Sequence, residues 1–257
     1  MKKSTILISI AVLGALYYFY SQTPKTESTH FVKNNLVVGI SPDYPPYAQI
    51  DLATGEIVGL EVDVVTEIAR RLDKKLEIKD MPFSSLIVEL AAQQIDLIAA
   101  GLTPNEERKK TVLFSHPYID NDDLIVVSKK SNPAITSLED LYGKPVAVNT
   151  GYTSDAFLSK TPEIHLVRLK SPTDGIMALN SDSVYAFATS KSNFSIFLEN
   201  QAENHNYQFF DLPSSADSCA LAYAKNNSKL QQEIDPIIDA MIKDGTMQTI
   251  KKKWGFE

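Results

Sequence analysis

The sequence predicts an α/β protein built from two domains that face each other. Strand-length apolar runs alternate with helical patterns from residue 36 onward, an order typical of parallel sheets with right-handed crossovers. One arrangement also occurs twice, a strand end followed by a glycine and a helix start, at residues 97–108 and 145–158. A chain of 257 residues allows one large domain or two of about 100 residues each. The repeated arrangement favours two domains.

Composition excludes several functions. The net charge of −7 and the pI near 5.2 argue against nucleic acid as a partner, because no basic stripe is present to neutralise phosphates. The single cysteine, Cys219, excludes an intramolecular disulfide. The four histidines have no metal-ligand spacing, and the chain contains no G-x-S-x-G, Walker-type or H-E-x-x-H motif. We therefore expect no metal, no cofactor and no catalytic residues.

The N-terminus predicts export. Lys2 and Lys3 precede residues 6–20, an uncharged apolar stretch shorter than a comfortable membrane span. No clean small-x-small cleavage site follows, and the tyrosines near its end suit a membrane interface. Residues 1–30 are thus predicted to be a signal peptide or membrane anchor plus a tether. The mature protein is expected in the periplasm, tethered to the inner membrane if the segment is not cleaved.

Proline interrupts the first βα unit at the end of its first strand. Residues 41–47 contain three prolines, which remove backbone donors, so this segment is expected to be a stiff loop. Residues 51–59 form a predicted hairpin tip with Thr54-Gly55 as its turn. Apolar periodicity predicts strands at 36–40, 76–79, 97–100, 124–127, 145–148, 184–188 and 219–224, and helices at 62–72, 86–91, 155–158, 177–179, 230–242 and 250–254.

Further signals mark helix ends in the second half of the chain. Residues 137–140 have the spacing of a capping box, and Gly245 is a C-cap candidate. Pro236 lies inside a helical pattern, where we expect it to kink or split the helix.

Arg108 is the first candidate for ligand binding. Asn105 is a predicted N-cap, which places Arg108 in the first helical turn after a strand end and a glycine. A guanidinium donates two parallel N–H bonds to a carboxylate, and helix-start amides favour the same negative charge. Alternatively, Arg108 joins Lys109 and Lys110 on a solvated helix face.

Several motifs together resemble one family. The chain contains, in order, VGISPDYPPY, GEIVGLEVDVV, FSSLIVEL, IDLIAAGLTPNEERKK, VLFSHPY, SLEDLYGKPVAVNTGYT and DGTMQTIKKKWG. Over residues 36–255 this series resembles the amino-acid-binding proteins of ABC importers, the bacterial extracellular solute-binding proteins of family 3, and most of all those of arginine, glutamine and histidine type. The resemblance implies a monomer that carries an amino acid to an ABC permease in the membrane.

The same resemblance implies a fold. This is the type II periplasmic-binding-protein fold, with two lobes that are each a mainly parallel sheet flanked by helices, joined by two hinge strands. Lobe 1 would comprise residues 31–120 with 216–257, and lobe 2 residues 121–215. The two crossings would fall near residues 118–122 and 214–218.

The resemblance also implies roles for individual residues, if the family's binding positions are transferred motif by motif. Arg108 would bind the ligand's α-carboxylate with help from Thr153, and Thr103 would occupy the hydroxyl position after the strand end. Tyr44 and Phe83 would flank the ligand side chain. The full set of candidate ligand-binding residues is Ser41, Asp43, Tyr44, Phe83, Gly101, Thr103, Arg108, Thr150, Tyr152, Thr153 and Thr189.

Two positions depart from the family pattern. Ser41 stands where an acid often contacts a cationic or amide side chain, and Thr189 where an aspartate usually holds the α-ammonium. An unpaired buried ammonium is costly, so another carboxylate should substitute, and Asp43 is the nearest candidate. The ligand is expected to be a polar amino acid of arginine or glutamine type, with a neutral amino acid or an amine-free acid as alternatives.

Two other functions remain open for this resemblance. One is a membrane-anchored sensor domain, and the other is an enzyme of cyclohexadienyl-dehydratase type on the same fold. The enzyme would need a carboxylate or histidine in the cleft as proton donor, and the matched positions here are hydroxyl, aromatic or arginine residues.

Overall fold

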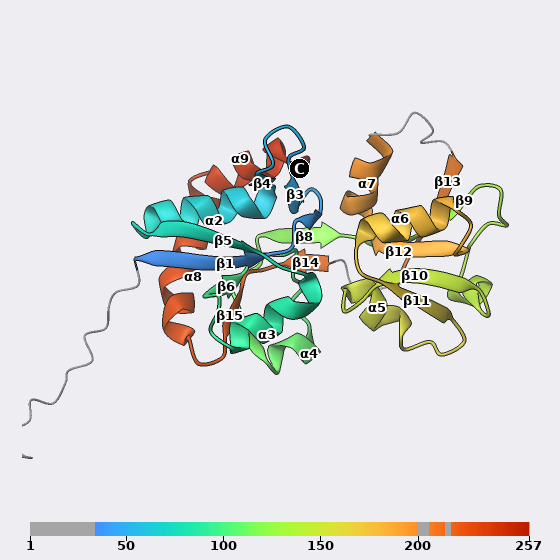
Figure 1. The fold of residues 1–257 in the computed structure, drawn as a ribbon, viewed down its shortest axis with the longest axis horizontal. Helices are drawn as coiled ribbons and strands as arrows, with labels where there is room; N and C mark the ends of the chain where they lie inside the picture. Colours follow the sequence, from blue (N-terminus) through green and yellow to red (C-terminus); the bar gives the residue numbers. More distant parts are fainter. Residues whose placement is uncertain (1–33, 200–205, 214–216, 257) are drawn as a thin grey trace, which may run out of the picture. The chain divides into compact units, whose positions relative to one another are not determined.

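The computed structural model describes residues 34–256 apart from 200–205 and 214–216, and the residues from Asn35 onward belong to one compact unit (Figure 1). The predicted signal or anchor segment, residues 1–30, lies outside the described residues. This part of the chain forms two five-stranded α/β sheets with flanking helices, as predicted. None of the described helices is long and apolar enough to cross a membrane.

The first sheet contains strands from both ends of the chain. β5, β1 and β6 are parallel, and β15 pairs antiparallel with β6 and β7. We call this sheet and its helices lobe 1. Its strands, in sheet order, are β5 (Lys75–Asp80), β1 (Asn35–Ile40), β6 (Leu97–Ile98), β15 (Ala222–Ala224) and β7 (Val112–Phe114), and its α-helices are α2 (Leu60–Arg71), α3 (Leu86–Ala91), α4 (Glu106–Lys109), α8 (Ser228–Lys243) and α9 (Thr246–Lys253).

The second sheet is formed by the middle of the chain, and we call it and its helices lobe 2. β11, β10 and β12 are parallel, while β9 pairs antiparallel with β12 and β13. The strands in sheet order are β11 (His165–Leu169), β10 (Pro145–Asn149), β12 (Ala186–Ser190), β9 (Leu124–Lys129) and β13 (Tyr207–Asp211), and the helices are α5 (Thr153–Leu158), α6 (Pro172–Asn180) and α7 (Lys191–Glu199), with a 3₁₀ turn at Leu138–Leu141.

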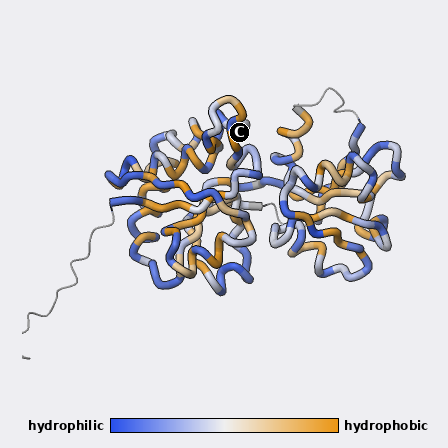
Figure 2. The backbone as a smooth tube through the Cα atoms, viewed as in Figure 1, coloured by the Kyte–Doolittle hydropathy of each residue, from blue (hydrophilic) through white to orange (hydrophobic). Residues whose placement is uncertain are grey.

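Both faces of each sheet are buried, which explains why the central strands are continuous apolar runs (Figure 2). In β1, Val38 packs into the cluster on the α2 and α8 side, whereas Val37 packs into the cluster on the α3 side. In β9, Val126 and Val127 divide in the same way between the two faces of the second sheet. Each lobe therefore has a core on either side of its sheet.

A two-stranded antiparallel pair connects the two sheets in the chain. β8 (Ile119–Asp122) lies between β7 of lobe 1 and β9 of lobe 2, and β14 (Asp217–Cys219) lies between β13 of lobe 2 and β15 of lobe 1. Near this pair, the Tyr47 hydroxyl donates to Asp122, which also accepts from the amide and hydroxyl of Ser192 in α7. Tyr47 lies in the loop between the first two strands of a small antiparallel sheet, which we count with lobe 1. This sheet consists of β2 (Asp43–Tyr44), β3 (Ala48–Ile50) and β4 (Ile57–Val58).

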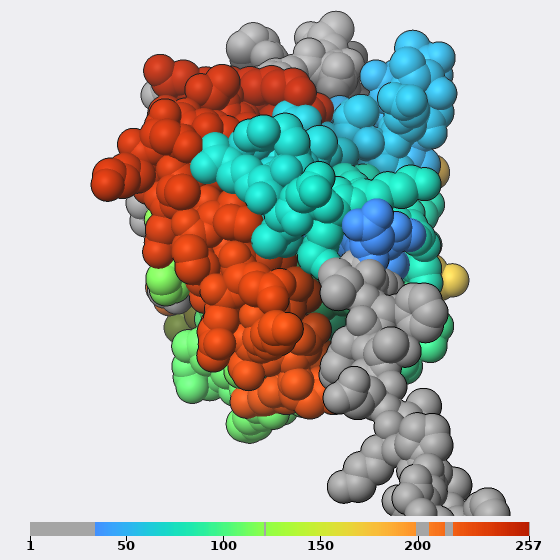
Figure 3. All heavy atoms as spheres, turned by 90° about the vertical axis from the view of Figure 1, so that its left-hand side faces the viewer, coloured from blue at the N-terminus to red at the C-terminus, as the bar shows by residue number. Residues whose placement is uncertain are grey.

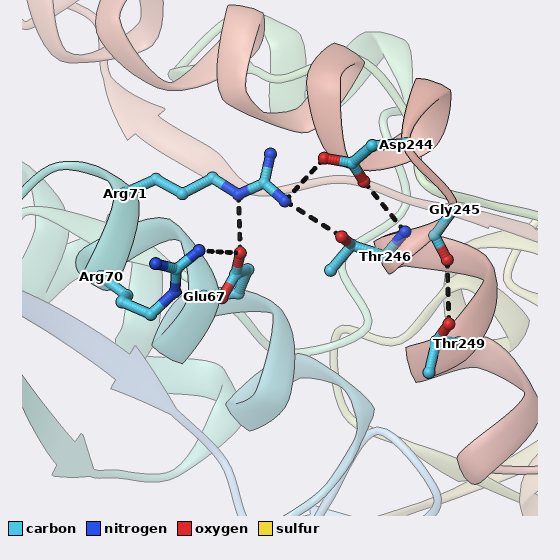
Figure 4. Close-up of polar contacts among 7 residues, drawn as sticks. All are labelled: Glu67, Arg70, Arg71, Asp244, Gly245, Thr246 and Thr249. Atoms are coloured by element: carbon cyan, nitrogen blue, oxygen red, sulfur yellow. Dashed lines mark hydrogen bonds and ion pairs between the residues drawn. The ribbon is translucent and has the colours of Figure 1, made fainter.

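The C-terminal helices pack against the first helix of lobe 1. Figure 3 shows the C-terminal segment and the segment around α2 side by side on one face. Arg71 of α2 donates to Glu67 in its own helix and reaches Asp244 and Thr246 at the junction of α8 and α9 (Figure 4). Segments from the beginning and the end of the described chain are thus joined within lobe 1.

The structure corrects one expectation and excludes one of the two alternatives stated for another. The apolar run 219–224 is not one strand, because Cys219 ends β14 in the crossing pair and Ala222 begins β15 in the first sheet. Pro236 does not split its helix, since α8 continues from Ser228 to Lys243 and buries Ile234 and Ile238 on either side of it. Gly245 does follow the end of α8 with a φ of 83°.

Some elements were not predicted. Their runs are short or interrupted by charged and polar residues, so periodicity alone did not mark them. These are β2, β7, β11, β13 and α7. β2 lies within residues 41–47, which were expected to be a loop throughout.

Candidate functional site

A small cavity lies where residues of the two lobes meet. Its free space is about 10 Å³, which is room for about one water molecule. A larger ligand therefore enters only if side chains or lobes move apart. The lining residues are Tyr44, Phe83, Ala100, Gly101 and Arg108 from lobe 1 and Leu124, Tyr152, Thr153, Ser154, Thr189 and Ser190 from lobe 2.

Arg108 is the one charged side chain in this lining among the described residues. As predicted, it lies in the first turn of α4, where the Asn105 side chain accepts from its backbone N–H. Its side chain is buried rather than solvated, and it donates to the carbonyl of Thr103 in lobe 1 and to that of Gly151 in lobe 2, each at 2.9 Å. The guanidinium carbon lies 5.6 Å from the centre of the Phe83 ring.

Aromatic rings surround the same cavity. Tyr44 stacks on Tyr47 with a ring-centre distance of 5.3 Å, and its ring is nearly perpendicular to that of Tyr152 at the same distance. Phe83 lies 4.3 Å from Tyr152. The Tyr152 hydroxyl is buried and has no hydrogen-bond partner within the described chain. A buried hydroxyl in a cavity wall normally has a partner, so this group is well placed to bind a polar ligand atom.

Hydroxyl and amide groups hold the lobes together around the cavity. Tyr44 donates to the Ser190 hydroxyl at 2.7 Å, and the Thr153 hydroxyl donates to that of Thr103 at 3.2 Å. The Asn193 side chain donates to the carbonyl of Pro45 at 2.9 Å. A ligand that replaces these bonds must contact both lobes.

A buried carboxylate supports the cavity wall in lobe 1. Glu61, the second residue of α2, is 0% exposed and accepts from the Gly101 N–H at 2.8 Å and from the Tyr118 hydroxyl. Burial raises the pKa of Glu61 to about 7, although both hydrogen bonds lower it. Gly101 has a φ of 58°, a conformation that glycine adopts readily.

Lobe 2 contains a corresponding turn. Gly151 has a φ of 80°, and its N–H donates to the carboxylate of Asp155 at 3.0 Å. Asp155 also forms an ion pair with Arg168 of β11 at 3.0 Å. In each lobe, a carboxylate thus accepts a hydrogen bond from the N–H of a glycine turn beside the cavity.

The structure brings most of the candidate ligand-binding residues together. Four of the candidates do not line the cavity, namely Ser41, Asp43, Thr103 and Thr150. Thr103 nevertheless lies next to it, because it accepts hydrogen bonds from Thr153 and Arg108. Ser41 is buried and donates to Asp43, whose pKa is raised by burial and lowered in part by that bond. Thr150 is exposed and donates to the carbonyl of Leu169. The lining residues that sequence reasoning missed are Ala100, Leu124, Ser154 and Ser190.

The molecule has two α/β lobes, a crossing strand pair that connects them and a buried arginine where they meet. These features define the class of two-lobed ligand-binding proteins. The chain belongs to the bacterial extracellular solute-binding proteins, family 3, whose family model matches residues 36–257. Membership in this family, which comprises binding proteins, confirms the prediction that the chain is not an enzyme.

Relatives with similar sequences span nearly the whole chain. The arginine-binding extracellular protein ArtP of Bacillus subtilis (strain 168) is 31% identical, over 97% of this chain and 96% of its own length. The ABC transporter glutamine-binding protein GlnH of the same organism is 30% identical, over 91% and 86%. Among solved structures, a mutant of ArgBP from T. maritima is 35% identical with a TM-score of 0.80, over 87% of this chain and 96% of its own.

Proposed function

We propose that this protein is the solute-binding component of an ABC importer and captures a polar amino acid, of arginine or glutamine type, between its lobes. The buried Arg108, which donates to backbone carbonyls of both lobes at the cavity, carries this proposal. The names of the relatives, an arginine-binding and a glutamine-binding protein, support it. The permease partner, a periplasmic location and a tether through residues 1–30 belong to the same proposal.

Arg108 would bind the α-carboxylate. A carboxylate forms two charge-assisted hydrogen bonds with a guanidinium, which are stronger than those to neutral carbonyls. The ligand carboxylate would thus replace the carbonyl of Gly151, and the hydroxyls of Thr103 and Thr153 would turn toward it. Tyr44 and Phe83 would flank the ligand side chain, with the Tyr152 hydroxyl available to a polar atom.

Binding would require the lobes to open and close. The free space is too small for an amino acid, and direct hydrogen bonds now join the lobes. We propose that lobe 1 comprises residues 31–120 with 216–257 and lobe 2 residues 121–215, with β8 and β14 as the hinge. The sheet membership of the strands supports this division. Only a ligand that contacts both lobes would then favour the closed form.

Calorimetric titration and thermal-shift measurement on the purified protein test this function, with the twenty amino acids and amine-free carboxylic acids as probes. We expect L-arginine or L-glutamine to raise the melting temperature. Arg108→Ala should weaken that binding about 100-fold, since it removes a charge-assisted pair worth about 3 kcal/mol. Arg168→Ala removes an arginine of lobe 2 outside the cavity and should retain binding. Equal binding by wild type and Arg108→Ala would refute the carboxylate role.

A further inference from the structure

We propose that Glu61 is a positioning residue that responds to the positive charge of the ligand from behind the cavity wall: it holds Gly101 in place and releases a proton when an ammonium group binds. This inference rests on the proposed function, because it requires a ligand with an amine.

The geometry places a carboxylate directly behind the cavity. Gly101 lines the cavity, and its N–H donates to Glu61 at 2.8 Å, so one backbone residue separates the carboxylate from the ligand space. The second Glu61 oxygen accepts from Tyr118, the residue before β8. Glu61 therefore connects the ligand-facing turn to the start of the crossing strand.

The cavity needs a negative charge that its own lining does not contain. Arg108 is the sole charged lining residue in the described chain, and an ammonium group enclosed there would lose its water. Charges interact strongly across a buried peptide group because little water screens them. Two other carboxylates lie near the lining, and both differ from Glu61. Asp43 is partly exposed, and Asp155 is paired with Arg168.

The surroundings of Glu61 leave its charge sensitive to the ligand. Both hydrogen-bond donors to it in the described part of the chain, Tyr118 and Gly101, are neutral. Behind Tyr118 lie Cys219 and Tyr223, and burial raises the pKa of both tyrosines well above the usual value.

The charged groups closest along α2 are already paired. Asp63, in α2, forms an ion pair with Lys253 of α9. The pKa of Glu61 is about 7, so near neutral pH both of its protonation states are populated, and a nearby cation shifts it toward the charged state.

The consequence is a pH-dependent affinity. If the ammonium lowers the pKa of Glu61 by about one unit, affinity rises about fivefold between about pH 6 and pH 8, and binding near pH 7 releases part of a proton. An amine-free analogue has no ammonium group to place beside Gly101, so it should release no proton. The analogue of glutamine carries only negative charge, whereas that of arginine keeps its side-chain guanidinium and so tests whether the α-ammonium itself is required.

Calorimetric titration of the full-length protein tests this. The probes are L-glutamine and L-arginine, each beside its amine-free analogue, 5-amino-5-oxopentanoate and 5-guanidinopentanoate. Titration in two buffers of different ionisation enthalpy counts the protons released. Wild type should release protons with the amino acids and none with the analogues.

Three variants make the test specific. Glu61→Gln keeps an acceptor for Gly101 and should abolish proton release and flatten the pH profile. Asp155→Asn changes the corresponding carboxylate of lobe 2 and should retain both. Tyr118→Phe removes a hydrogen bond that lowers the pKa of Glu61, so it should shift the pH profile of the affinity to higher pH. This variant provides a second readout if Glu61→Gln folds poorly.

The outcomes separate this inference from the function on which it rests. If wild type binds the amino acids but Glu61→Gln releases as many protons, or Tyr118→Phe leaves the pH profile unchanged, the role of Glu61 is refuted. Equal release with an amine-free analogue also refutes it. If wild type binds neither amino acid at any pH, the proposed function itself fails.

Discussion

The two glycine turns beside the cavity have similar local geometry, but the carboxylates that accept their N–H hydrogen bonds have different surroundings. Gly101 and Gly151 both have positive φ, and both donate their N–H to a carboxylate. Glu61 comes from a helix 40 residues earlier in the chain and is fully buried with neutral donors. Asp155 lies four residues after its glycine and is paired with Arg168. The turn of lobe 1 therefore depends on a buried carboxyl group without a cationic partner among its hydrogen-bond donors, whereas that of lobe 2 uses a local ion pair.

Two turns with similar backbone geometry can therefore differ in what they cost in stability. A buried carboxylate without a cationic partner is unfavourable when it is charged, so it reduces stability while making the site responsive to a ligand. Asp155 is buried too, but it forms an ion pair with Arg168, whose side chain is half exposed. The comparison predicts that lobe 1, not lobe 2, determines how both stability and binding depend on pH.

The largest expected effect comes from Glu61→Gln in the ligand-free protein. The pKa of Glu61 is about 7 in the folded state against 4.5 for the free group, so the folded state binds the proton more tightly. The free energy of unfolding should then decrease as pH rises from 4.5 to about 7, by about 3 kcal/mol from this group, and level off above. Urea unfolding at several pH values should show this decrease in wild type, and Glu61→Gln should lack it.

Asp155→Asn is the matched control for that series. It should lower stability without removing the decrease between pH 4.5 and 7. If the decrease persists unchanged in Glu61→Gln, the charge behind Gly101 is not the source of the pH dependence, and the contrast between the two turns loses its basis.

The second prediction compares the glycines themselves. An added Cβ at Gly101 would lie 3.2 Å from two ring carbons of Tyr44, which is held by stacking on Tyr47 and by its bond to Ser190. At Gly151 it would meet nothing within 4 Å. Both alanines carry the cost of a positive φ, about 1 kcal/mol.

We therefore expect Gly101→Ala to cost about 2 kcal/mol of stability and to weaken ligand binding, and Gly151→Ala to cost about 1 kcal/mol with little effect on binding. Thermal unfolding and calorimetric titration of both variants measure the difference. Equal losses of affinity would mean that Tyr44 is not constrained as the structure indicates.

Local patterns in the sequence predicted much of this fold and part of the site. The N-cap at Asn105 and the capping box that begins at Ser137 both exist, because each depends on residues a few positions apart. The positions of Arg108 and Gly101 after a strand end follow from the same local logic. Such features need no knowledge of the distant chain.

The role of Glu61 needs that knowledge. In sequence, Glu61 and Asp63 are both first-turn acids of one amphipathic helix, yet Glu61 is buried behind Gly101 and Asp63 pairs with Lys253. No local signal distinguishes them. The division of the 219–224 run has the same cause, since the change from the crossing pair to the first sheet is set by partners elsewhere in the chain.

Loss of the ion pair in lobe 2 is expected to have only a small effect on stability. The Arg168 side chain is 48% exposed, so water and salt screen its ion pair with Asp155. Arg168→Met should cost at most about 1 kcal/mol of stability at low salt and less at high salt, because Asp155 retains its bonds from Gly151 and Ser159. Urea unfolding at two salt concentrations measures this. A loss of stability as large as the effect expected for Glu61 would show that the lobe 2 turn depends on the Arg168 cation. The contrast drawn between Glu61 and Asp155 would then be wrong.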